Sequence, residues 1–177
     1  MLQLTILPKK DLWDEKNERF MSFKGQTLVL EHSLVSISKW ESRWHKAFLA
    51  EPRKSHDELV DYIRCMTLTQ NVDPLTYDCL SQSDIEKVKQ YIDDPMTATV
   101  IKETPTARKG PQQIITSELI YYWMVALQIP SKYEKWHLNR LMTLIKICNI
   151  ENQPKKKMSK DELYARNARL NAARRKK

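Results

Sequence analysis

Glycine is nearly absent from this chain of 177 residues, which contains only Gly25 and Gly110. Phosphate-binding loops and dinucleotide-binding fingerprints need several closely spaced glycines, because their backbone turns tightly and approaches the phosphates. Two glycines so far apart in the sequence form neither motif. The sequence therefore excludes most classes of nucleotide-dependent enzyme.

The residue spacings of a metal site or a catalytic centre are also missing. None of the four histidines has a second histidine or a cysteine three or four positions away, the spacing that places two ligands on one helix face. The odd number of widely separated cysteines favours reduced core thiols: Cys65, Cys79 and Cys148. Carboxylates at 57, 58 and 61 suit the first turn of a helix, and His137 suits a structural role in an apolar helix. We therefore expect no enzymatic activity, no metal and no cofactor.

Long apolar runs are missing as well. No segment approaches the roughly 20 apolar residues that span a bilayer. The first residues, MLQLTILPKKDLW, lack the basic-then-apolar order of a signal peptide. A chain of this length is able to bury one sizeable core. We expect a soluble, intracellular protein with no membrane partner.

Positive charge is concentrated at the C-terminus. The chain has 30 Lys and Arg against 22 Asp and Glu, a formal net charge of +8. Residues 155–177 hold ten of the basic and two of the acidic residues, so residues 1–154 are neutral overall. We predict a helical globular domain over 1–154 and a basic tail over 155–177. Repulsion within the tail and its thin apolar face make a helix there marginal in isolation.

The hydrophobic pattern predicts a mainly α protein. We expect a compact helical domain of about five or six helices, a minor N-terminal β element, and a basic C-terminal tail that is either helical or disordered. Apolar and polar residues alternate at 2–6 and again at 26–32, after Gly25. This pattern indicates a small antiparallel ribbon within about 2–31.

Serine, threonine and aspartate residues mark the expected helix starts, because their side chains accept the free N–H groups of a first turn. Ser33 is the candidate cap of a helix whose apolar stripe includes Phe48 and ends before Pro52. The next three start signals follow along the chain: Ser55 with Glu58, Asp73 before Pro74, and Ser83 with Glu86.

Two further helices are expected at 116–128 and 131–149, capped by Thr116 and by a box of Ser131 with Glu134. Their short connection favours antiparallel neighbours at the centre of the domain. Residues 93–113 contain three prolines and a glycine, which indicate a loop, with a short strand expected around 97–101.

The aromatic residues of this helix pair are typical of core packing, because aromatic side chains at helical spacing are usually buried. Tyrosine and tryptophan still carry a polar tip. The exposed edges of three of them are therefore candidates to line a groove for a partner: Tyr121, Tyr122 and Trp136. The remaining candidate contacts are cations of the tail: Lys155, Lys156, Lys157, Lys160, Arg166, Arg169, Arg174 and Arg175.

Six segments together resemble a family encoded in the tail-morphogenesis gene region of tailed bacteriophages and prophages. They read SLVSISKWESRWHKAFL, DYIRCMTLTQNVDP, PMTAT, IITSELIYYWMVALQIP, KWHLNRLMTLIKICN and KKMSKDELYARNARLNAARR. The resemblance covers the chain from about Leu2 to Arg175. The family is that of tail assembly chaperones or closely associated tail proteins.

The resemblance implies a non-enzymatic factor that binds the phage tape-measure protein and keeps it soluble until tail-tube subunits polymerise around it. It also implies action in the cytoplasm of the bacterial host, absence from the mature virion, association between copies, and a longer form made by ribosomal frameshifting. A helical surface with apolar grooves suits a long, self-associating helical client.

Two other functions stay open at this point. The basic tail suits a nucleic-acid-binding accessory protein whose arm follows a phosphate backbone, but its one aromatic residue, Tyr164, and the lack of a recognition motif make nucleic acid the less favoured partner. The third possibility is a structural component of the virion, such as a head-to-tail connector part.

Overall fold

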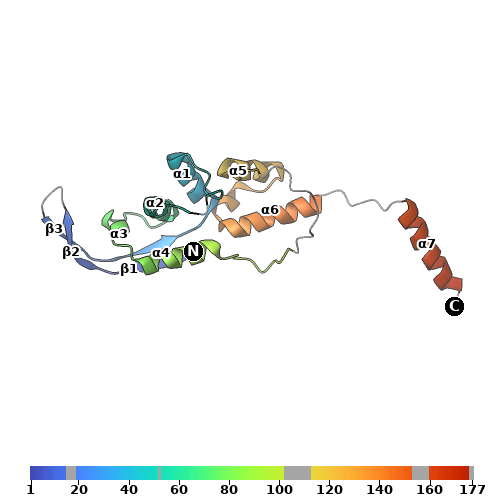
Figure 1. Ribbon diagram of the computed structural model, residues 1–177, viewed down its shortest axis with the longest axis horizontal. Helices are drawn as coiled ribbons and strands as arrows, with labels where there is room; N and C mark the ends of the chain where they lie inside the picture. Colours follow the sequence, from blue (N-terminus) through green and yellow to red (C-terminus); the bar gives the residue numbers. More distant parts are fainter. Residues whose placement is uncertain (15–18, 52, 102–112, 153–159, 176–177) are drawn as a thin grey trace.

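A computed structural model describes residues 1–14, 19–51, 53–101, 113–152 and 160–175. Within these residues the protein is mainly α-helical, as predicted (Figure 1). The strands and helices follow in the order β1 (Leu2–Ile6), β2 (Lys9–Asp14), β3 (Arg19–Phe23), β4 (Gln26–Leu30), α1 (Leu34–Trp44), α2 (His56–Met66), α3 (Leu75–Asp78), α4 (Gln82–Asp93), α5 (Ser117–Ala126), the 3-10 helix η1 (Ser131–Lys135), α6 (Leu138–Asn152) and α7 (Lys160–Arg175).

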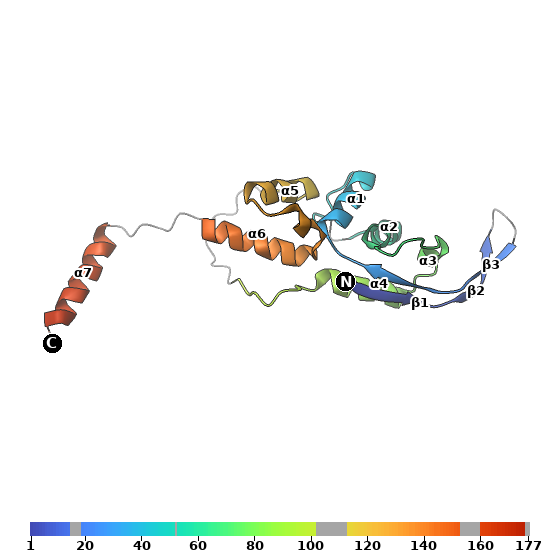
Figure 2. The same cartoon turned by 180° about the vertical axis from the view of Figure 1, so that it is seen from behind.

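The N-terminal residues form the predicted antiparallel ribbon. β1 pairs with β4 in a register that places Leu2 opposite Leu30 and Leu4 opposite Leu28. Leu4 and Ile6 face the core while Gln3 and Thr5 are exposed, so the alternation seen in the sequence is that of a half-buried strand. β2 and β3 pair in turn and extend as an arm beyond the helices (Figures 1 and 2).

Helix α1 begins where the sequence predicts and ends earlier. The Ser33 hydroxyl accepts a hydrogen bond from the N–H of Ser36, and the Ser36 hydroxyl accepts one from the N–H of Ser33. His45 then takes a left-handed conformation, with φ of 52°, and ends the helix. The prediction that Phe48 belongs to the helical stripe is wrong, because the chain has already turned. Phe48 is nevertheless buried.

The next three helices confirm one start signal and correct two. Ser55 and Glu58 form the predicted capping box of α2. The predicted cap Asp73 accepts a hydrogen bond from the N–H of Leu75, but Pro74 holds the cap position of α3 without a side-chain cap bond, and the helix is only one turn long. Helix α4 begins two residues earlier than the predicted box of Ser83 and Glu86 implies, at Gln82. Its cap is Ser81, which exchanges hydrogen bonds with Asp84.

The C-terminal half of the domain differs from prediction at one point. Thr116 caps α5 as predicted, but Ser131 and Glu134 form no capping box. Pro130 instead leads into η1, which has no side-chain cap, and α6 begins only at Leu138. The helix predicted over 131–149 is therefore split. The strand expected at 97–101 is also not formed in the described residues, and 102–112 lie outside them.

The residues Glu31, His32 and Ser33 join β4 to α1 and are hydrogen-bonded to α2 and α6. The N–H of Glu31 donates to the carbonyl of Met66 at the end of α2, and the N–H of Leu138 donates to the carbonyl of His32. We call residues 31–33 the central crossing. The side chains around it form one core of aliphatic and aromatic residues, among them Leu30, Ile37, Trp40, Tyr62, Ile120 and Leu141.

His137 has the structural role that the sequence indicates. It is buried, and its Nε2 lies 3.0 Å from the carbonyl oxygen of Tyr91, while its Nδ1 accepts from the N–H of Asn139. The cysteines are thiols and not disulfides, as predicted: Cys65, Cys79 and Cys148.

Candidate partner-binding surface

Helix α5 is apolar on two opposite faces. Ile120 and Met124 point into the core. On the other side, Tyr122 is 66% exposed and Val125 is 78% exposed. We call the exposed residues Glu118, Tyr122, Val125 and Ala126 the outer α5 face. A surface helix normally carries polar residues on the side opposite the core, so an apolar outer face indicates a surface used for contact.

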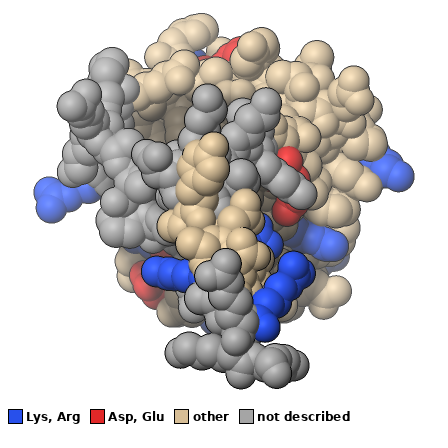
Figure 3. Space-filling model, turned by 90° about the vertical axis from the view of Figure 1, so that its right-hand side faces the viewer, with Lys and Arg blue, Asp and Glu red and all other residues tan. Residues whose placement is uncertain are grey.

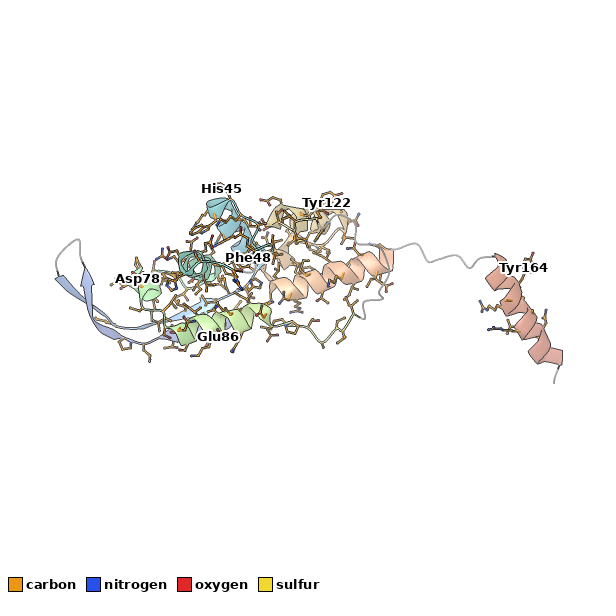
Figure 4. All side chains as sticks on the ribbon, viewed as in Figure 1. His45, Phe48, Asp78, Glu86, Tyr122 and Tyr164 are labelled. Atoms are coloured by element: carbon orange, nitrogen blue, oxygen red, sulfur yellow. The ribbon has the colours of Figure 1, made fainter. Side chains whose placement is uncertain are left out.

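The other two aromatic candidates lie where α5 meets η1. The hydroxyl of Tyr121 donates to a carboxylate oxygen of Glu134 over 3.1 Å. Burial, followed by this hydrogen bond and then the Glu134 charge, raises the pKa of Tyr121 to about 12. The Trp136 ring packs against that of Tyr133, tilted by 32° with centroids 4.2 Å apart, and the guanidinium of Arg140 lies 4.1 Å from the Trp136 ring. Tyr121 and Trp136 are therefore half-buried and held in place, whereas Tyr122 is free to meet a partner (Figure 4).

The cationic candidates lie on or before α7, which stands apart from the helices of the body (Figures 1 and 2). Lys155, Lys156 and Lys157 fall outside the described residues, and Lys160 and Arg175 are the first and last residues of α7. Arg166, Arg169 and Arg174 are exposed along the helix. In a view of the end of the molecule that carries α7, lysine and arginine side chains lie to the left and right of the centre (Figure 3).

Helices α2 and α3 border a cleft of about 390 Å³ that sequence reasoning missed. We call it the α2–α3 cleft. Asp61 is already paired there, accepting from Arg43 over 2.7 Å and from the indole N–H of Trp44 over 3.0 Å. Arg64 lies over the Tyr77 ring at 4.9 Å. The full lining is Trp44, His56, Asp57, Val60, Asp61, Arg64, Tyr77, Asp78 and Leu80.

A second cleft, of about 690 Å³, lies between the segment after α1 and helices α2 and α4. Its central cation is Lys54, whose amine donates to the carbonyls of Phe48 and Glu51, both over 2.9 Å, and lies 3.8 Å from the Phe48 ring. Burial lowers the pKa of Lys54, and the nearby charges of Glu51 and Glu58 oppose that shift. Through these two hydrogen bonds Lys54 links residues within the segment between α1 and α2.

The buried histidines belong to the interior and not to a surface site. His32 is 1% exposed, and its Nδ1 is hydrogen-bonded to the hydroxyl of Tyr62. Burial, followed by the charges of His137 and Lys54, lowers the pKa of His32 to about 3. Burial also raises the pKa of Tyr62. Across the described part of the chain, no group of three or more His, Cys, Asp or Glu residues is arranged to hold a metal ion.

The acidic residues at the start of α2 do more than the predicted favourable interaction with the helix dipole. Glu58 completes the cap of the helix and pairs with Lys46 over 2.7 Å. Asp61 links α2 to α1 through Arg43 and Trp44. Asp57 has no cationic partner among the described residues and faces the α2–α3 cleft. Its carboxylate is therefore available to a ligand or a partner.

None of the helices in the described residues has the length and apolar character needed to cross a membrane. In comparisons with known proteins, no family model matches the chain, and neither a curated protein nor a solved structure matches it.

Proposed function

We propose that the protein is a non-enzymatic tail assembly chaperone of a tailed bacteriophage, which binds the tape-measure protein and keeps it soluble in the host cytoplasm during tail assembly. The six segments that resemble this family motivate the proposal. The protein does its work by binding and release, and it is absent from the finished virion.

The observation that carries the proposal is the outer α5 face. Tyr122 and Val125 are three positions apart on one helix and both are largely exposed, while the opposite side of α5 is packed into the core. A rigid helix that offers apolar side chains beside Glu118 suits an amphipathic helical client, whose apolar stripe is otherwise free to aggregate.

The test is co-expression with the cognate tape-measure protein. We expect the intact protein to move the tape-measure protein from the insoluble to the soluble fraction, and the Tyr122→Ser/Val125→Ser variant to lose this effect. Val100→Ser is the matched control, because Val100 is also highly exposed but lies outside α5. A tape-measure protein that stays insoluble beside the intact chaperone contradicts the proposed function. If Val100→Ser reduces the solubility of the tape-measure protein as much as Tyr122→Ser/Val125→Ser does, the outer α5 face is not the binding surface.

The exposed arginines of α7 favour one alternative, a nucleic-acid-binding accessory protein. In that case deletion of 155–177 abolishes DNA or RNA binding, and the affinity of the intact protein falls steeply with salt through counterion release. Under the chaperone proposal, binding to nucleic acid is weak throughout. Detection of the protein in purified phage particles favours instead a structural component of the virion.

A further inference from the structure

The α2–α3 cleft presents negative charge beside apolar and aromatic walls. Its carboxylates are those of Asp57, Asp61 and Asp78. Asp61 is paired with Arg43, and Asp78 lies near Arg64, so Asp57 is the carboxylate without a cationic partner among the described residues. Asp57 is exposed, and the side chain of Asp78 is 61% exposed and only 4.0 Å from Arg64. The remaining walls of the cleft are half-buried apolar and aromatic side chains, which suit contact with an aromatic or aliphatic group: Trp44, Val60, Tyr77 and Leu80. This cleft suits a basic segment that carries an apolar anchor.

Helix α7 has that chemistry. Tyr164 is 69% exposed, Leu170 is about half exposed, and Arg169 and Arg174 are exposed on the same helix. An isolated helix of 16 residues with such a thin apolar face is marginally stable in water. A surface that covers the tyrosine and neutralises the arginines therefore stabilises α7 as well as binding it.

We propose that α7 of one copy docks in the α2–α3 cleft of another copy of the same chain. The complementary charges of the two surfaces select this occupant. A second copy is favoured over the chain's own helix because Asp78 and Tyr164 lie far apart along the molecule (Figure 4).

The two docking surfaces are different parts of the protein, so the contact is heterologous. Each copy offers a free cleft and a free helix, and repeated docking gives rings or open chains and not a closed two-fold dimer. The partners are held by exposed charges, whose attraction is screened over roughly 8 Å at physiological salt and over roughly 3 Å at 1 M salt. Association therefore depends on both protein concentration and ionic strength. This inference concerns the protein alone and does not rest on the proposed function.

The test is analytical ultracentrifugation of the full chain, without a client, at low and high salt. We expect concentration-dependent association at low salt that is lost at 1 M salt. Asp78→Lys should weaken it about tenfold or more, while Glu86→Lys, the same charge change on the exposed face of α4 (Figure 4), should not. Lysine at the C-terminal end of α3 is compatible with the helix dipole, so Asp78→Lys is expected to fold.

A charge exchange identifies α7 as the occupant. The helix variant Arg169→Glu/Arg174→Glu and the cleft variant Asp57→Lys/Asp78→Lys should each stay monomeric alone and associate when mixed. Circular dichroism and thermal melting check that both are folded. A monomeric intact protein at low salt, equal weakening by Glu86→Lys, or no association on mixing overturns the proposal. A monomer that is more compact with α7 than without it also overturns the proposal, because it indicates docking within one chain. Association that requires bound nucleic acid overturns it as well.

Discussion

The carboxylate of Glu41 in α1 accepts a hydrogen bond from the backbone N–H of Ser117, the first residue of α5, over 2.8 Å. Its other oxygen accepts from the N–H of Phe48, also over 2.8 Å. One buried side chain thus satisfies a free donor at the start of α5 and another in the segment after α1. It also places a negative charge at the positive end of the α5 dipole.

Replacement of Glu41 by Ala should lower the free energy of unfolding by about 3 kcal/mol, because two buried N–H groups lose their acceptor. Glu41→Gln keeps one carbonyl oxygen and should lose about half as much. Urea denaturation followed by circular dichroism measures both. Glu86→Ala, an exposed substitution, should stay within about 0.5 kcal/mol of the intact protein. Equal stability of Glu41→Ala and Glu86→Ala would show that the bridge is unimportant.

Leu141→Ala should lower the free energy of unfolding by about 3 kcal/mol, since Leu141 is 0% exposed and its removal leaves a cavity. Trp123 is only half-buried, so Trp123→Ala should lose less, about 1.5 kcal/mol, by removing part of the apolar contact area. Thermal melting of the two variants side by side gives the comparison. A larger loss at Trp123 would contradict this placement of the two residues in the core.

Stability should fall as the pH is lowered from 7 to 5, because the pKa of His32 is lowered to about 3 in the folded protein. The unfolded chain binds a proton at this histidine below a pH of about 6.5 while the folded chain does not, so acid favours unfolding. The contribution from His32 is about 2 kcal/mol between these two pH values and continues to be lost until the pH reaches the folded pKa.

Urea denaturation at a series of pH values measures this dependence, and His32→Gln is the variant that isolates it. Glutamine retains a hydrogen-bonding partner for Tyr62 but does not titrate. The variant should therefore be less stable at pH 7 and should show a flatter pH profile. An unchanged slope would assign the pH dependence to other groups.

Gly25→Ala should lower the free energy of unfolding by about 2 kcal/mol. Gly25 has φ of 82°, and a Cβ atom there would lie 2.9 Å from the carbonyl oxygen of Ile6 and 3.0 Å from Cδ of Pro8. Both the backbone strain and the close contacts oppose alanine at this position. Lys24→Ala, at the neighbouring exposed residue, is the control and should change the melting temperature little.

Features that depend on a few neighbouring residues were predictable from the sequence. The Ser55 and Thr116 caps and the alternation of Leu4 and Ile6 are examples, since each reflects local backbone hydrogen bonding or strand period. The start of α4 shows where local rules become ambiguous. The sequence SQSDIE contains two overlapping capping boxes, and the folded chain uses Ser81 with Asp84 although Ser83 with Glu86 fits the pattern equally well.

The missed features come from contacts between distant segments. α6 starts at Leu138 and not near Ser131, because the N–H of Leu138 is held by the carbonyl of His32. The α2–α3 cleft combines the last residue of α1 with residues along α2 and residues in and just after α3, so no single motif marks it. On the candidate surface, sequence reasoning identified Tyr122 but did not separate it from Tyr121, because only the packing of η1 shows which of the two is held.

The central crossing also constrains the order of events during synthesis. The carbonyl of His32 and the backbone of Ser33 find their partners in Leu138 and His137, which leave the ribosome much later. Until then the N-terminal ribbon, α1 and α2 are able to approach one another, but the central crossing lacks its partners on one side. The chain between Ser33 and His137 must bring its two ends together before these contacts form, and closure of so long a segment slows folding. The nascent N-terminal half therefore exposes its unfinished core to other chains for most of translation.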